Sequence, residues 1–351
     1  MKLESNRFLL QITLCLIVTF CLFGCRDKSK NIPDVSGIEV PLNIIRFDQE
    51  LFSLDTDAIS DGLAQLTETY PDFSEVYFGR LLGAYDKRLA PDGPDPYIRG
   101  FVADSRIRKL MDTCQIVFGD FSDEAKAFQE AFKFYKYYFP DRETPSVTTY
   151  ISEYIIGAFI YGDAKLAVGL DFFLGADYPY EQINPGNPNF SNYLTRSFNK
   201  DHLVARTLMP LVEDMVGPEP GPKLLDLMVH QGKKRYILEQ LMPNTLDSVL
   251  FEHTEEQMGW LVDNELDMWA FFLDEELLYS SRQKDIRKFV ELSPDSPGMP
   301  PEAPGNTGTW MGYKIVSAYM DKFPETTLDQ LIMMRDAQKI LNDSRYRPKL
   351  K

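Results

Sequence analysis

A chain of 351 residues, 44% of them hydrophobic, is long enough to bury a large core without disulfide or metal cross-links. Its 53 acidic and 37 basic residues give a net charge of −16, which argues against a nucleic-acid-binding protein, because such binding depends mainly on Lys and Arg. The same charge disfavours attachment to anionic lipid head groups through the protein surface.

The N-terminus has the pattern of a lipoprotein signal peptide. Basic residues at positions 2 and 7 precede a mostly apolar run from Phe8 to Gly24, which is typical of a secretory signal. The run ends in Leu-Phe-Gly-Cys at residues 22–25, which resembles a bacterial lipobox with a bulkier second residue than usual. The run is also about long enough to cross a membrane, so an uncleaved signal anchor is the alternative. We predict that residues 1–24 are a lipoprotein signal peptide.

Cleavage there would make Cys25 the lipidated N-terminus, and residues 25–36 would form a polar, lipidated tether. The net charge would change from −16 to −17, because two basic residues and one acidic residue are lost. Cys114 would then have no partner for an intramolecular disulfide. We therefore expect a lipid-anchored protein of the cell membrane or outer membrane, facing the periplasm, with the lipid as its membrane contact.

The remaining residues, 37–351, are predicted to form a single mostly helical domain around a small β-sheet, which is an α+β fold. Apolar residues alternate from Ile38 to Ile44, which predicts a strand, and Pro41 would place that strand at an edge of the sheet. Helical spacing then predicts helices at residues 47–54, 58–70, 73–82, 97–111 and 123–138.

Between residues 145 and 180 the period changes. Short runs rich in β-formers predict strands at 147–151, 155–161 and 166–170. The C-terminal half is helical again. Thr254 and Thr327 each open a capping box with Gln three residues later, and we predict long helices from them to Tyr279 and to about Leu341.

The stretch from Asn199 to Tyr236 is predicted to be two helices joined by a turn that contains Pro and Gly, with Asn199 or Asp201 as the first N-cap. The site helix of a zinc peptidase carries His-Glu-x-x-His, which puts two imidazoles on one face of the helix beside a carboxylate base. A third ligand, often Glu, comes from a later helix. The two helices of this stretch have the same order.

The residues at those places have the wrong chemistry for a zinc peptidase. His202 matches the first ligand, but Leu203 stands in place of the base and Arg206 in place of the second histidine. Gln231 stands where the later Glu ligand would be. We therefore predict a degenerate site made of these four residues.

Histidine chemistry is limited because the chain has only three histidines, His202, His230 and His253. A three-histidine zinc site would need all of them to converge, whereas zinc sites usually draw two ligands from one short motif. The sequence contains no Gly-rich phosphate loop, no Gly-x-Ser-x-Gly and no Cys-x-x-Cys. We predict no catalytic residue, no metal ligand and no cofactor.

Two glycines, Gly305 and Gly308, precede a helix predicted at residues 310–319. Glycines before a helix can bring backbone N–H groups to an anion. The other explanation is a loop that needs positive φ angles together with a close approach between helices. The sequence favours the second explanation.

Several separate runs of the chain point to the same family. They are Phe47-Asp48, residues 150–175 ending in Phe-Phe-Leu-Gly, His230-Gln-Gly-Lys-Lys234, Trp260 to Trp269, residues 304–316 and Ser344-Arg-Tyr-Arg-Pro348. Together with the lipobox, they make the chain resemble the gliding-motility lipoprotein B family (GldB) of the Bacteroidetes over nearly the whole mature chain.

The resemblance implies a cell-envelope lipoprotein associated with gliding motility and with secretion of surface adhesins. The same pattern is distantly similar to predicted zinc metallopeptidases, which implies a degenerate zincin-like fold. Of the peptidase residues, only His202 and Gly232 match.

The expectation from sequence is therefore a non-catalytic envelope lipoprotein that binds an envelope partner. Three alternatives stay open: a metal-dependent peptidase with atypical ligands, a lipoprotein that binds a peptide or glycan, and a structural scaffold. Bound metal would favour the first, a deep apolar groove the second, and a surface without a groove the third.

Overall fold

The computed structural model describes residues 32–183 and 185–348. The chain divides into two units between Asp34 and Val35, and every element described below belongs to the second unit, Val35–Lys351. The predicted signal peptide and Cys25 lie outside the described residues. The elements are mostly helices, with a small mixed sheet, which confirms the predicted α+β class.

The strands are β1 (Ile44–Ile45), β2 (Val147–Tyr150), β3 (Ala158–Tyr161) and β4 (Lys165–Gly169). The helices of the N-terminal half are α2 (Phe47–Phe52), α3 (Ile59–Thr69), α4 (Pro71–Ser74), α5 (Pro94–Ala103), α6 (Ser105–Phe118), α7 (Ser122–Tyr138), α8 (Tyr180–Ile183) and α9 (Asn192–Thr195), with a π-helix at Glu75–Leu81. Those that follow are α10 (Lys200–Val216), α11 (Leu224–Leu241), α12 (Asp247–Phe251), α13 (Glu255–Asp263), α14 (Glu265–Asp274), α15 (Gln283–Ile286), α16 (Thr307–Lys322), α17 (Leu328–Met333) and α18 (Ala337–Ser344).

The strands of the described chain pair in the order β1-β2-β4-β3. β1, β2 and β4 run parallel, and β3 runs antiparallel to β4 through a hairpin whose turn contains Gly162 at φ 50°. β1 and β3 are therefore the edges. The three strands predicted between residues 145 and 180 are confirmed.

The strand predicted from Ile38 is wrong over most of its length, because only Ile44 and Ile45 pair with β2. Pro41 cannot donate to a ladder. The carbonyl of Val40 instead accepts a hydrogen bond from the Gln129 side chain of α7 (3.0 Å), so it is satisfied outside the sheet.

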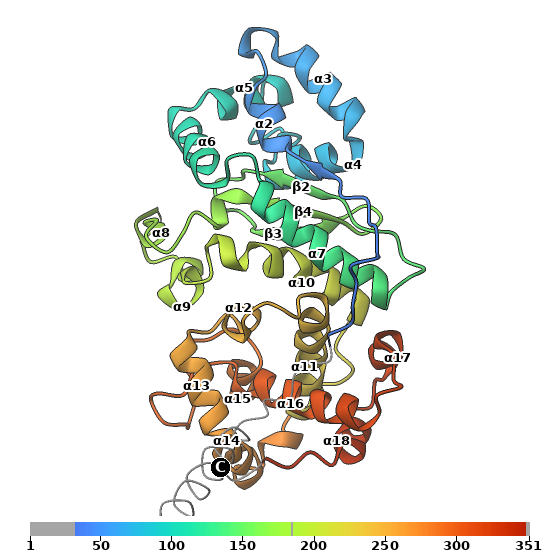
Figure 1. Ribbon diagram of the computed structural model, residues 1–351. Helices are drawn as coiled ribbons and strands as arrows, with labels where there is room; N and C mark the ends of the chain where they lie inside the picture. The colour runs from blue at the N-terminus through green and yellow to red at the C-terminus, as the bar shows by residue number, and fades with distance from the viewer. Residues whose placement is uncertain (1–31, 184, 349–351) are drawn as a thin grey trace, which may run out of the picture. The chain divides into compact units, whose positions relative to one another are not determined.

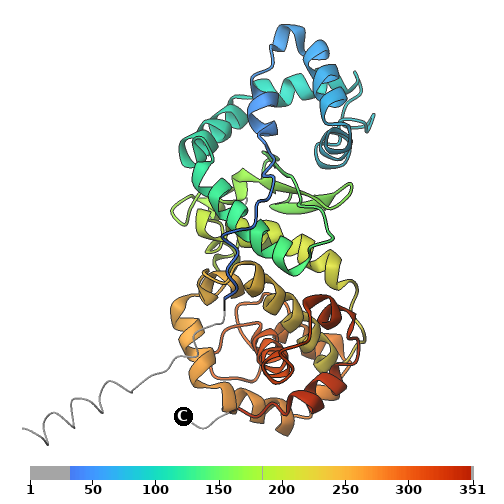
Figure 2. The ribbon, with the colours of Figure 1, turned by 45° about the vertical axis from the view of Figure 1, so that its right-hand side comes forward.

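Aromatic side chains fill one side of the sheet. Phe73 of α4 contacts the rings of Tyr150, Phe159 and Tyr161 at centroid distances of 5.3 to 6.3 Å, and Tyr77 of the π-helix contacts Tyr150. α10 packs against β3 and β4. In Figures 1 and 2, α2–α5 lie on one side of the sheet and α10 on the other. α10 is thereby held by the sheet along part of its length.

The connection from β2 to β3 is held by a buried carboxylate. Asp171, which is 0% exposed, accepts hydrogen bonds from the backbone N–H groups of Ser152 (3.2 Å) and Tyr154 (2.7 Å). These bonds fix two successive non-glycine residues, Glu153 and Tyr154, at φ 57° and 63°. Such left-handed backbone conformations are unfavourable for most residues other than Gly and Asn. The Asp171 carboxylate therefore helps to stabilise a strained connection.

α11 and α16 make the closest helix–helix contact. A Cβ atom on Gly232 of α11 would lie 2.2 Å from the carbonyl carbon of Gly312, and one on Gly312 would lie 1.7 Å from the carbonyl oxygen of Met228. Figure 2 shows α16 nearly end-on, surrounded by the other C-terminal helices. Gly305 likewise touches the backbone of Ser293. The glycines of residues 304–313 thus serve close packing, as the sequence favoured, although the positive φ belongs to Asn306.

Three helices predicted as continuous are broken. Asp104 ends α5 and caps α6 through its carboxylate, and Asn264 separates α13 from α14. The helix that begins after Thr327 stops at Met333, and α18 starts anew after Asp336. There the ammonium of buried Lys233 donates hydrogen bonds to the carbonyls of Ile332 (3.4 Å) and Met334 (2.8 Å). These carbonyls therefore accept from Lys233 at the point where the helix is interrupted.

Candidate functional site

The site begins at the N-terminus of α10, where Asn199 is the cap. Its side-chain oxygen accepts from the backbone N–H groups of Asp201 (3.1 Å) and His202 (3.4 Å), which satisfies two donors that a helix start leaves free. The amide nitrogen of Asn199 donates to the carbonyl of Arg196 (2.9 Å). Because the nitrogen is committed there, the oxygen must face His202.

This arrangement fixes the tautomer of His202. Its Nδ1 lies 2.9 Å from the Asn199 side-chain oxygen, which can only accept, so Nδ1 carries the proton. Burial lowers the pKa of His202, and the charges of Arg206 and Arg196 lower it further against the opposing effect of Glu252. The imidazole is therefore neutral near pH 7, and its Nε2 is a hydrogen-bond acceptor.

Arg206 lies one turn after His202, on the same face of α10. Its guanidinium carbon is 4.8 Å from the centre of the Phe198 ring and 5.6 Å from that of Phe173, and its Nη1 donates to Ser197 Oγ (2.9 Å). Its Nε lies 3.9 Å from a carboxylate oxygen of Glu252. The two rings and the two polar contacts hold the guanidinium in one position.

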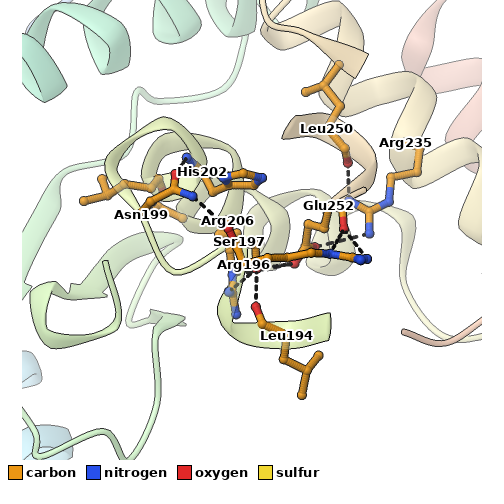
Figure 3. A network of polar contacts seen from close by, with 11 residues as sticks. Leu194, Arg196, Ser197, Asn199, His202, Arg206, Arg235, Leu250 and Glu252 are labelled. Carbon is orange, nitrogen blue, oxygen red and sulfur yellow. Dashed lines mark hydrogen bonds and ion pairs between the residues drawn. The ribbon is translucent and has the colours of Figure 1, made fainter. Parts of the chain in front are cut away.

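Glu252 is the centre of the network, as Figure 3 shows. It follows α12 in a left-handed conformation (φ 58°), and its carbonyl accepts from Arg196 Nε (3.1 Å) and Nη2 (2.9 Å). Its carboxylate accepts a hydrogen bond from Ser197 Oγ (3.3 Å) and lies 3.5 Å from Arg235 Nη2 of α11. Arg235 also donates to the carbonyl of Leu250.

The charges of this network determine the state of the carboxylate. Burial alone would raise the pKa of Glu252, but the charges of Arg206 and Arg235 outweigh it and hold that pKa below its ordinary value. Glu252 is thus ionised at neutral pH. Burial, with the charges of Arg196 and Arg235, lowers the pKa of His253 to about 3, so that imidazole is neutral as well.

The structure brings together two of the four predicted site residues. His202 and Arg206 both belong to the Glu252 network. Leu203 is fully buried in the hydrophobic core instead, and no hydrogen bond or ion pair among the described residues joins Gln231 to His202 or Arg206. On α11 it is Arg235, one turn after Gln231, that reaches the network.

Sequence reasoning missed Arg196, Arg235 and Glu252. Glu252 precedes a capping box, and nothing in its neighbourhood marks it as a partner of residues about 50 positions earlier. His253 contributes its Nδ1, 3.4 Å from Arg196 Nη2, and was considered only as part of a three-histidine site. The tertiary contacts of α10 and α11 with α12 bring these groups together.

Residues 32–183 and 185–348 contain neither a metal-binding cluster nor a membrane-spanning helix. No group of three or more His, Cys, Asp or Glu side chains there is arranged to hold a metal ion. In the same part of the chain, no helix combines the length and apolarity that a bilayer span requires.

Comparison with known proteins gives one match. A family model described as "Gliding motility protein GldB" matches residues 28–348. No curated protein and no solved structure matches the chain.

Proposed function

This chain belongs to the gliding motility protein GldB family and is thus a gliding-motility-related protein, and we propose that it is a non-catalytic lipoprotein of the cell envelope that acts by binding an envelope partner. In this proposal Cys25 carries the lipid anchor, and the folded unit faces the periplasm. The fold is a degenerate relative of the zinc metallopeptidases, with α10 as the former site helix.

The ion pair between Arg206 and Glu252 is the observation that carries the proposal. Zinc hydrolysis needs three ligands, an open fourth position and a base that takes a proton from bound water. Here a permanently charged guanidinium lies one turn from His202, where a second ligand would be required. The carboxylate of the network, Glu252, already faces two guanidinium groups.

The position of His202 supports descent from a metal site. Asn199 holds Nδ1–H and leaves Nε2 as the free acceptor, which is how a metal-binding imidazole is commonly oriented by an outer partner. The first ligand and its support are thus retained, while the second ligand is replaced by a cation. Such a site favours binding without hydrolysis.

Metal analysis of full-length protein, purified in detergent without chelators, tests the non-catalytic part. We expect no stoichiometric zinc in the wild type and no change of metal content in His202→Ala. Stoichiometric zinc that is lost in His202→Ala would instead establish a metalloprotein with atypical ligands.

Cross-linking and affinity purification of the tagged full-length protein from its own envelope tests the partner. We expect a specific envelope protein to be recovered with wild type. A protein that recovers nothing above the level of an unrelated tagged lipoprotein would contradict a partner-binding role.

A further inference from the structure

The Glu252 network carries an excess of positive charge. Arg206 and Arg235 form ion pairs with the carboxylate of Glu252, and Arg196 donates to its backbone carbonyl. These four side chains carry three positive charges and one negative charge, a net charge of +2, while the two histidines are neutral. Elsewhere in the described chain the arginine ion pairs match one guanidinium to one carboxylate, as in Arg46–Asp48 and Arg142–Asp329. The network is thus a half-buried cluster with excess positive charge in a chain whose net charge is −16.

A purely structural network would not favour this imbalance. Removing guanidinium groups from water costs free energy that only opposite charge or good hydrogen bonds recover. The side chains of Arg206 and Arg235 are only 25% and 11% exposed. The carbonyls of Glu252 and Leu250 satisfy N–H donors of Arg196 and Arg235, but one carboxylate leaves two positive charges unbalanced. An additional anion would restore the balance.

Arg206 is in a position to receive that anion. One of its terminal nitrogens, Nη1, donates to Ser197, and among the described residues Nη2 has no hydrogen-bond acceptor. Its contacts with Phe198 and Phe173 fix the plane of the guanidinium. A fixed guanidinium with free donors binds a carboxylate in the two-point geometry that Arg favours.

The neighbour of Arg206 on the same helix face specifies the ligand further. His202 Nε2 presents a lone pair, which attracts an N–H donor and repels an oxyanion. Glu252 likewise disfavours a dianion such as phosphate. The matching ligand has one carboxylate and an adjacent N–H group, which is the composition of a peptide C-terminus.

We propose that this network binds the C-terminal carboxylate of a peptide chain through Arg206, with the last amide N–H donating to His202 Nε2. The proposal rests on the proposed partner-binding function, because it assigns the chemistry by which the partner is held. The ligand is a protein ending in a free carboxylate.

Binding of two short peptides to full-length protein in detergent tests it, measured by isothermal titration or ligand-observed NMR. Acetyl-trialanine with a free carboxylate should bind, and its C-terminal amide should bind roughly 10- to 100-fold more weakly, which is the effect of a charge-assisted hydrogen bond. Arg206→Gln should weaken binding of the free-acid peptide by a similar factor, and Arg206→Lys should weaken it by less. His202→Ala should weaken binding of the free-acid peptide but leave binding of acetate unchanged.

Arg108→Gln is the matched control. Arg108 also donates to a backbone carbonyl, that of Phe52 (2.8 Å), and lies over a phenylalanine ring, but it is outside the network. Its loss should leave peptide binding unchanged, and thermal unfolding of each variant reports whether it is folded. Equal binding of acid and amide, no binding of either, phosphate binding more tightly than the peptide, or equal effects of Arg206→Gln and Arg108→Gln would overturn the proposal. Recovery of a partner from envelopes would be unaffected by that failure.

Discussion

Among single residues, Asp171 couples the fold to pH. Complete burial raises the pKa of this carboxyl from 3.8 to about 6, against the opposing effect of the hydrogen bonds from Tyr154 and Ser152. Because the folded pKa is higher than the unfolded one, the native state binds the proton more tightly. Protonation of Asp171 therefore stabilises the fold, and this contribution is full below about pH 4 and is lost as the pH rises through 6.

Asp171→Asn should remove this dependence. Relative to the variant, wild-type protein should gain up to roughly 3 kcal/mol of unfolding free energy as the pH falls from 7 to 4. Urea unfolding at several pH values measures the difference. Asp177→Asn, at an exposed position, is the control and should run parallel to wild type. A difference between Asp171→Asn and wild type that stays constant with pH would refute the assignment.

For whole elements, the contact between α11 and α16 depends on the absence of two side chains. A Cβ on Gly232 meets the backbone of Gly312, and backbone cannot move aside as a flexible side chain can. Gly232→Ala should therefore force the helices apart and destabilise the protein by about 3 kcal/mol.

The matched control is Gly259→Ala on α13. A Cβ there meets nothing within 4 Å, so alanine should stabilise the helix by about 0.5–1 kcal/mol through its lower backbone entropy in the unfolded chain. Chemical unfolding of both variants gives the comparison. Equal effects of the two substitutions would mean that the close approach of α11 and α16 contributes nothing to stability.

The helix starts marked by a capping box could be predicted from the sequence, but the points at which those helices end could not. The capping boxes at Thr254 and Thr327 are both formed, because each depends on residues three positions apart. The helix after Thr327 stops at Met333, where Lys233 of another helix donates hydrogen bonds to two backbone carbonyls and so competes with the helical hydrogen bonds. That competition depends on tertiary packing.

The same distinction applies to the site. The spacing of His202 and Arg206 on one helix face is a local property and was predictable. Glu252 is reached only because α10 packs on α12, and α11 has Arg235 rather than Gln231 in the network. Sequence reasoning thus found the helix of the site but missed the charge at its centre.

For the molecule as a whole, Cys25 is predicted to determine where the protein resides. A single acyl chain holds a protein only weakly, whereas two or more hold it stably. We expect wild type in the membrane fraction and Cys25→Ala as soluble protein or unprocessed precursor. Cell fractionation, with mass spectrometry of the mature N-terminus, checks this, and an N-terminus without lipid would rule the anchor out.

The pairing of β1 with β2 has a consequence for the order of folding. Ile44 meets Val147, so joining these strands closes a loop of roughly 100 residues, whose entropy cost delays the contact relative to local ones. β3 and β4 are joined by a tight hairpin and can pair first. The N-terminal strand then has only two residues with which to hold its place. We predict that the segment nearest the predicted tether docks late and is the first part of the sheet to detach when the chain is pulled from its N-terminal end.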